Sequence, residues 1–113
     1  MPIKLFRQNK GKIRKISSSY SILNLLTADN TKRMSVALAE SVNHQETTKT
    51  TSDHAYYILS GKIIVNKKII GKSKDLVYIP AKTKYTFQGT FIALLINSPA
   101  FKPENERIYL IRK

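Results

Sequence analysis

The stretch that decides the fold runs from His54 to Ile70 and reads HAYYILSGKIIVNKKII. It is rich in β-branched and aromatic residues, which favour strands. Residues 66–68, Asn-Lys-Lys, separate two β-branched runs, and this spacing predicts a tight hairpin. The stretch therefore predicts short strands that follow one another through turns.

Short apolar runs continue on both sides of this stretch. Further runs lie at residues 76–79, 85–87, 91–96 and 108–111, and glycines and prolines separate them. Residues 34–40 alternate with the two-residue period of a strand. One side of this strand would carry Met34, Val36 and Leu38, and the other Ser35, Ala37 and Ala39. This pattern predicts a single all-β domain, folded as a sandwich or barrel.

Three segments do not show this pattern of short apolar runs separated by turn residues. Residues 20–28 could form either a short helix or a strand. Residues 48–53 (TKTTSD) are expected to form a polar loop. Residues 99–106 (PAFKPENE) are expected to form a second loop, because its two prolines do not fit a central strand. Phe101 is expected to plug the end of the core there.

Composition limits the possible functions. The 113 residues include no cysteine, which excludes a disulfide framework, thiol catalysis and cysteine-bound zinc. No apolar run reaches the length of a membrane span or a signal-peptide core. We therefore expect a soluble, cytoplasmic protein that has no contact with the membrane. The net charge of +13 would attract anions, although lysines spread along the chain also serve solubility.

Three segments resemble the cupin family of small jelly rolls. Residues 54–65 resemble the end of the first cupin motif, in which a glutamate lies seven residues before a glycine. Residues 75–87 (DLVYIPAKTKYTF) resemble the second motif, in which a histidine follows a proline by five residues. Residues 97–104 resemble the last strand and tail. The resemblance implies a double-stranded β-helix (a jelly-roll or cupin barrel) at 34–113, with a basic arm and leading strands at 1–33 in the same domain.

The resemblance also shows where this chain departs from metal-binding cupins, which offer three histidines and a glutamate. His54 stands at the glutamate position and Tyr85 at the last histidine position, while residues 47–50 contain no histidine. Transition metals bind where three or four imidazole or carboxylate ligands converge. We therefore expect no metal and no cofactor, and a site built from His44 and His54 is kept as an alternative.

Alternation along the strands predicts the lining of the barrel. Tyr56 would share an inward face with His54, and Phe87 would share another with Tyr85. Lys49 could hold a carboxylate or phosphate at the mouth. Tyrosine and phenylalanine in such places also serve as core residues. The predicted ligand-binding residues are His54, Tyr56, Tyr85, Phe87 and Lys49, and no catalytic residue is predicted.

Three functions follow as hypotheses. The first is a metal-independent cupin-like protein that binds a small, anionic molecule in the barrel, with catalysis left open. The second is a nucleic-acid-binding or scaffold protein, although no recognition helix or zinc finger is present. The third is a metalloenzyme with unusual ligands. We also predict a homodimer, because open sheets leave edges that need protection, with the basic N-terminal segment as a candidate part of the interface. The basic residues concerned are Lys4, Arg7, Lys10, Lys12, Arg14 and Lys15 in the arm, and Lys62, Lys67, Lys68, Lys72 and Lys74 near the hairpin.

Overall fold

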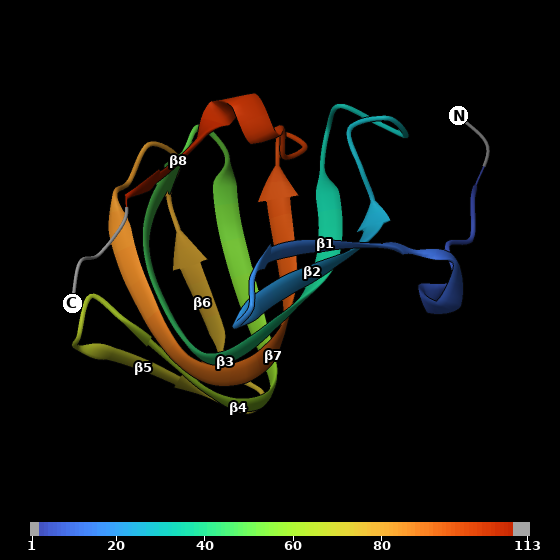
Figure 1. The fold of residues 1–113 in the computed structure, drawn as a ribbon. Coiled ribbons are helices and arrows are strands. Elements are labelled where there is room, and N and C mark those ends of the chain that lie inside the picture. Colours follow the sequence, from blue (N-terminus) through green and yellow to red (C-terminus); the bar gives the residue numbers. More distant parts are fainter. Residues whose placement is uncertain (1–2, 110–113) are drawn as a thin grey trace.

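The computed structural model describes residues 3–109 and consists almost entirely of strands (Figure 1). Residues 20–26 form a strand, so the helical alternative for this segment is wrong. The predicted strand at 108–111 begins earlier, and its last two residues lie outside the described range. The all-β prediction is confirmed by eight strands and two short 3-10 helices among the described residues: β1 (Lys12–Ser17), β2 (Tyr20–Leu26), β3 (Ser35–Thr50), β4 (Asp53–Val65), β5 (Ile69–Lys72), β6 (Leu76–Ile79), β7 (Tyr85–Ser98), β8 (Glu106–Tyr109), η1 (Gln8–Lys10) and η2 (Pro103–Asn105).

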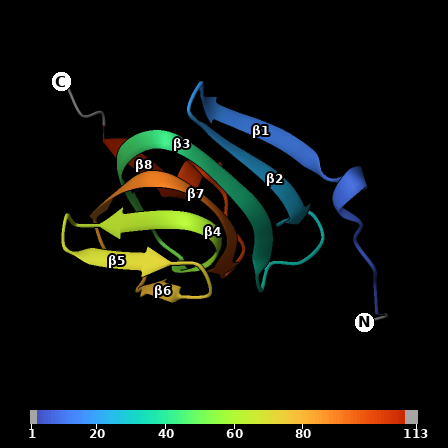
Figure 2. The same cartoon turned by 90° about the horizontal axis from the view of Figure 1, so that it is seen from below.

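The strands pair antiparallel in the order β1-β2-β3-β7-β4-β5, with β6 on β4 and β8 on β3. Strands β3, β4 and β7 are long and curve strongly, so that they wrap around the interior (Figures 1 and 2). Each of them therefore contributes to both sides of a jelly roll. The interior they enclose is where the site lies.

The long strands bend at bulges. The register of β4 against β7 shifts between Ile58 and Ser60, next to Gly61. Gly61 has a positive φ of 80°, and a Cβ there would lie 2.2 Å from the carbonyl oxygen of Thr90. Only glycine fits such a position. The glycine of the first motif thus bends one continuous strand, whereas the resemblance suggested a turn between two strands.

The predicted hairpin at residues 66–68 is confirmed. It joins β4 to β5, and both Asn66 and Lys67 have positive φ, at 52° and 61°. Positive φ at two successive turn residues matches the twist of antiparallel strands, and asparagine tolerates it well. The Asn66 side chain also accepts a hydrogen bond from the Thr86 amide, at 3.0 Å.

The predicted polar loop at 48–53 is wrong for its first half. Residues 48–50 belong to β3, and only residues 51–52 form the turn into β4. The reason is β8, which pairs Ile108 with Thr48 and Arg107 with Lys49. A hydrogen-bonding partner this far along the chain stabilises a polar strand that local composition marks as a loop.

The small residues of β3 face inward and the large ones outward. Ala37 and Ala39 are buried in the core, whereas Val36 and Leu38 are only half-buried on the outer face. Because alanine side chains are small, this arrangement leaves space inside the roll. Among residues 3–109, no helix is long and apolar enough to span a membrane.

Candidate functional site

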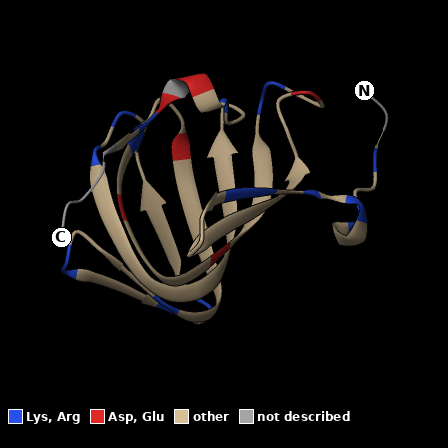
Figure 3. Ribbon diagram, in the orientation of Figure 1, with Lys and Arg blue, Asp and Glu red and all other residues tan. Residues whose placement is uncertain are grey.

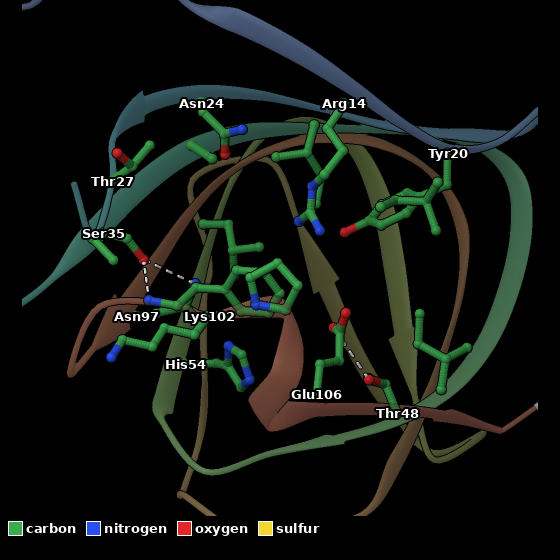
Figure 4. Close-up of a pocket in the computed structure, with 18 of the residues that line it drawn as sticks. Arg14, Tyr20, Asn24, Thr27, Ser35, Thr48, His54, Asn97, Lys102 and Glu106 are labelled. Carbon is green, nitrogen blue, oxygen red and sulfur yellow. Dashed lines mark hydrogen bonds between the residues drawn. The ribbon is translucent and has the colours of Figure 1, made fainter.

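A cavity of about 450 Å³ lies inside the roll. Its wall is formed by inward-facing side chains of β1 to β4, β7 and β8 (Figure 4). One end is lined by residues 27–29 and Lys32, which lie between β2 and β3, and by residues 101–104. Phe101 contributes to this end, where the Arg14 guanidinium lies 4.8 Å from its ring centre. Phe101 is thus half-buried beside the cavity, and the expected plug of the core is part of the cavity wall.

Aromatic residues form one wall of the cavity. The hydroxyl groups of Tyr56 and Tyr85 lie 2.5 Å apart, and Phe87 packs with a ring-centre distance of about 6 Å from each. All three side chains are buried. Burial raises the pKa of both tyrosines above the usual value. Both hydroxyls therefore stay protonated near neutral pH and can donate hydrogen bonds.

Two of the carboxyl groups that line the cavity accept hydrogen bonds from side chains of the barrel. Glu46, on β3, is buried, and its Oε1 accepts a hydrogen bond from His44 Nε2 at 2.9 Å. The His44 ring stacks on Tyr20 with centres 4.8 Å apart. Glu106, at the start of β8, accepts a hydrogen bond from the Thr48 hydroxyl at 3.4 Å. Burial, and after it the charge of Glu46, raises the pKa of Glu106.

His54 lies deep in the wall and is 4% exposed. Its Nε2 is hydrogen-bonded to the Thr50 hydroxyl, and its ring lies 6.1 Å from that of Tyr85. Burial lowers the pKa of His54 to about 4, because a charged imidazole loses its hydration there. His54 is therefore a neutral hydrogen-bonding group near pH 7.

Acidic residues concentrate at the cavity. Within residues 3–109, four of the seven acidic residues line it, but only three of the eighteen lysines and arginines. Figure 3 shows red segments along η2 and β8 and between β2 and β3, while blue segments are spread over the whole molecule. The interior thus does not share the strongly positive character of the surface. The charged lining residues are Asp29, Glu46, Glu104 and Glu106, and Arg14, Lys32 and Lys102.

Four of the residues proposed from the sequence come together at this wall: His54, Tyr56, Tyr85 and Phe87. Lys49 is not among the lining residues. It alternates with the buried Thr48 and Thr50 on β3 and is half-buried on the other face. His44 and His54 have separate partners, and no group of three His, Cys, Asp or Glu within residues 3–109 is placed to hold a metal.

Sequence reasoning missed Arg14, Glu46, Asn97 and Glu106. Glu46 could have been found from alternation, because it precedes the inward-facing Thr48 by two residues. Asn97 could have been found in the same way, because it follows the inward-facing Leu95 by two residues, whereas its place beside His54 depends on the register of β4 against β7. Glu106 lies in a segment that reads as a loop.

No protein-family model matches this chain, and no curated protein sequence matches it. Solved structures do match. Streptomyces Pac13, in a variant bound to uridine, superposes with a TM-score of 0.81 at 18% identity, over 99% of this chain and 95% of that one. The chain has a cupin-type fold.

Two further structures agree with this fold. The polyketide cyclase RemF from Streptomyces resistomycificus superposes with a TM-score of 0.76 at 13% identity, over 99% of this chain and 89% of that one. KdgF from Halomonas sp. gives a TM-score of 0.73 at 12% identity, over 87% of this chain and 96% of that one. At such low identity the likeness establishes the fold alone.

Proposed function

We propose that this protein binds a small polar molecule inside its barrel, without a metal ion. The observation that carries this proposal is a cavity of about 450 Å³ on which neutral and charged polar groups converge between apolar walls. Ligand sites typically have volumes of about 300–1,000 Å³ and combine these two kinds of surface. A barrel that served only as a scaffold would fill this space with side chains.

The solved structures support small-molecule binding in a barrel of this shape. Pac13 is a nucleoside dehydratase, and its structures include uridine complexes. RemF is a polyketide cyclase. Both act on or bind small organic molecules, and both share the fold described here over nearly the whole chain.

The side chains around His54 fit a metal poorly. Its Nε2 already bonds Thr50, and the nearest ring neighbours are Tyr56 and Tyr85. The pKa values of both phenols are raised by burial, so they would bind a cation only after costly deprotonation. Divalent transition metals prefer several imidazole, thiolate or carboxylate ligands.

An anionic substituent of the ligand would pair with Lys32 and Lys102 at one end of the cavity, where Asp29 and Glu104 also lie and leave only part of the positive charge free to bind it. The rest of the ligand would face hydroxyl, amide and carboxyl groups. Glu106, with its raised pKa, is the group best suited to exchange a proton with a ligand. Binding is the proposed function, and acid–base chemistry by Glu106 would be an addition to it.

Cavity filling tests this proposal. Ala37 faces the cavity from β3, whereas Ala55 lies on the outer face of β4. We expect Ala37→Leu to abolish the thermal stabilisation that a metabolite panel produces in the parent, and Ala55→Leu to preserve it. At one hundred times its dissociation constant a ligand stabilises the fold by about 2.7 kcal/mol. Stabilisation that survives Ala37→Leu would place the ligand elsewhere.

We also propose a homodimer, supported by an apolar outer face. Two rows of side chains cross the strands β3, β7, β4 and β6 in register there. Leu76 and Tyr78 in these rows are each 58% exposed. A second copy would cover this surface, because exposed apolar patches of this kind mark interfaces. The rows are Leu38, Leu94, Tyr57 and Leu76, and Val36, Ile96, Ala55 and Tyr78.

The N-terminal segment is a second candidate for this interface. It extends away from the barrel beyond β1 (Figure 1), and Ile3, Leu5 and Phe6 are exposed. Apolar side chains on an extended arm gain stability by packing on a partner. The arm of one copy would then contact the outer face of the other.

Binding of nucleic acid is a second candidate function, supported by the β4–β5 hairpin. Lys62 and Lys72 are direct cross-strand partners, and Lys67 and Lys68 lie in the turn between these strands. Like charges directly opposite one another are destabilising, and a phosphate backbone would relieve this repulsion. Such binding would weaken steeply with salt. Failure to retain an oligonucleotide at low salt would contradict it.

A further inference from the structure

Arg14, on β1, and Glu106, on β8, point toward each other from opposite sides of the cavity (Figure 4). In their ionised forms they carry opposite charges, yet they form no ion pair, since no guanidinium nitrogen of Arg14 lies within 4.0 Å of a Glu106 carboxyl oxygen. Burial raises the pKa of Glu106, the charge of Glu46 adds to this rise, and the charge of Arg14 opposes it. The two groups are therefore close enough to act on each other, with a gap between them.

The Tyr20 hydroxyl is a hydrogen-bond donor without an acceptor among the described residues. Tyr20 is only 5% exposed. Within residues 3–109, the unpaired side-chain atoms that the protein encloses completely belong to His54 and Asn97, so the Tyr20 hydroxyl keeps surface toward the cavity. Figure 4 shows this hydroxyl beside the Arg14 guanidinium. Burial, and after it the neighbouring Tyr85, raises the pKa of Tyr20, so the hydroxyl keeps its hydrogen near neutral pH.

The two carboxyl groups supply acceptors without donors. Glu46 Oε1 accepts the hydrogen bond from His44, and Glu106 Oε2 accepts that from Thr48. The second oxygen of each carboxyl receives no hydrogen bond from the described residues, and neither oxygen is completely enclosed. Both carboxyl groups and Arg14 influence the pKa of Tyr20, so all four groups lie close together. Polar groups that are largely buried are normally paired, which indicates that a bound molecule completes these hydrogen bonds.

We propose that this part of the cavity binds the α-carboxyl and α-amino groups of a free amino acid. This inference rests on the proposed function and names the class of ligand. The carboxylate would accept hydrogen bonds from Arg14 and Tyr20, and the ammonium group would donate to Glu106 and Glu46. Because both groups of an amino acid are attached to one carbon atom, a single small ligand joins the opposite charges that the protein keeps apart.

A zwitterion fits this site better than an ion of one sign. A simple anion would pair with Arg14 but would be repelled by the carboxyl groups, and a simple amine would be repelled by Arg14. A neutral ligand would form weaker hydrogen bonds, because charge-assisted bonds are about twice as strong as neutral ones. The volume of about 450 Å³ leaves room for a side chain, and an acidic side chain would meet Lys32 and Lys102 at the other end.

Matched probes test this proposal. The twenty common L-amino acids are first screened by thermal shift, and each one that stabilises the fold is titrated by calorimetry beside two analogues. One analogue lacks the α-amino group and the other lacks the α-carboxyl group. For L-glutamate these are glutarate and 4-aminobutyrate, and for L-phenylalanine they are 3-phenylpropionate and phenethylamine. We expect the amino acid to bind about tenfold more tightly than either analogue.

Two variants should divide the analogues in opposite ways. We expect Arg14→Met to weaken the amino acid and its carboxylate analogue about tenfold without weakening the amine. Glu106→Gln should weaken the amino acid and the amine without weakening the carboxylate analogue. The matched controls Arg107→Met and Glu40→Gln change exposed side chains that do not line the cavity, so all three affinities should stay unchanged. Arg14→Met and Glu106→Gln variants that weaken both analogues equally would overturn the assigned orientation.

Tyr20→Phe gives a readout that does not depend on which amino acid binds. Because the Tyr20 hydroxyl has no partner within the described fold, its removal should leave the free energy of unfolding of the free protein nearly unchanged. The same variant should weaken probes that carry the α-carboxylate severalfold. A loss of stability as large as that of Tyr56→Phe would show that the hydroxyl is already bonded inside the protein, and would overturn the inference.

The outcomes separate this inference from the proposed function. An amino acid and analogues that bind equally, all blocked by Ala37→Leu, would overturn the amino-acid assignment and leave the cavity as a binding site. The same holds if none of the twenty amino acids binds while another metabolite binds the parent and fails to bind Ala37→Leu. If no ligand in the panel responds to Ala37→Leu, both proposals fail.

Discussion

The hydroxyl groups of Tyr56, on β4, and Tyr85, on β7, form a hydrogen bond inside the barrel, with 2.5 Å between the two oxygens. Each ring also packs against Phe87. This hydrogen bond links two strands at the wall of the cavity. Each buried hydroxyl has the other as its hydrogen-bond partner.

A double-mutant cycle measures this dependence. We expect Tyr56→Phe and Tyr85→Phe each to lower the free energy of unfolding by about 1–3 kcal/mol, because each leaves a buried hydroxyl without its partner. The double variant should cost clearly less than the sum, since no orphaned hydroxyl remains. Denaturant unfolding gives the change in the free energy of unfolding for the two single variants and the double variant. Strictly additive costs would show that the two hydroxyls do not interact.

His54 should make stability depend on pH. Its folded pKa is about 4 and its ordinary value is 6.5. Between these values the unfolded chain binds the proton and the folded chain does not, so stability falls as pH decreases. We expect a loss of about 3 kcal/mol from pH 7 to below pH 4 relative to His54→Gln. Glu106 has the opposite effect: because burial raises its pKa, it makes the folded protein more stable as the pH decreases.

The comparison with His54→Gln isolates this effect, because Glu106 is present in both proteins. Denaturant unfolding at a series of pH values gives the difference directly. A difference that stays constant from pH 7 to pH 4 would mean that His54 is not held neutral by burial.

The hydrogen bond from His44 to Glu46 should stabilise the barrel wall. His44→Phe keeps a ring over Tyr20 but removes the donor to the buried Glu46 carboxyl. We expect the free energy of unfolding to fall by about 2 kcal/mol. Adding Glu46→Leu should recover part of this loss, because no buried carboxyl is then left unpaired. A second substitution that only adds to the damage would contradict this account.

The homodimer should depend on the apolar outer face. We expect the parent to scatter light as a dimer at micromolar concentration, and a variant with Leu76→Lys and Tyr78→Lys to scatter as a monomer with unchanged circular dichroism. Leu5→Asp with Phe6→Asp tests the N-terminal segment in the same way. A monomeric parent would exclude both interfaces.

Much of the fold could be predicted because it depends on local pattern. The alternation in residues 34–40, the hairpin at 66–68 and the spacing of the motif at 54–61 all correspond to features of the structure. The start of strand β8, at residues 106 and 107, could not be predicted, because it is stabilised by pairing with β3 more than fifty residues earlier. The same pairing explains why residues 48–50 are a strand.

Part of the cavity lining could be predicted for the same reason. His54, Tyr56, Tyr85 and Phe87 could be placed by alternation on strands that the motifs located. Asn97 could not be linked to His54 without the register of β4 against β7. The charge of Lys49 suits an anion, but strand alternation turns this side chain away from the cavity.

The most direct test of the central claim is NMR mapping of a bound metabolite on the protein. The account predicts that a ligand from the panel shifts the side-chain resonances of His54, Tyr56 and Tyr85 and leaves those of Lys62 and Lys72 unchanged. Shifts confined to the hairpin lysines, with the cavity residues unmoved, would contradict a binding site inside the barrel.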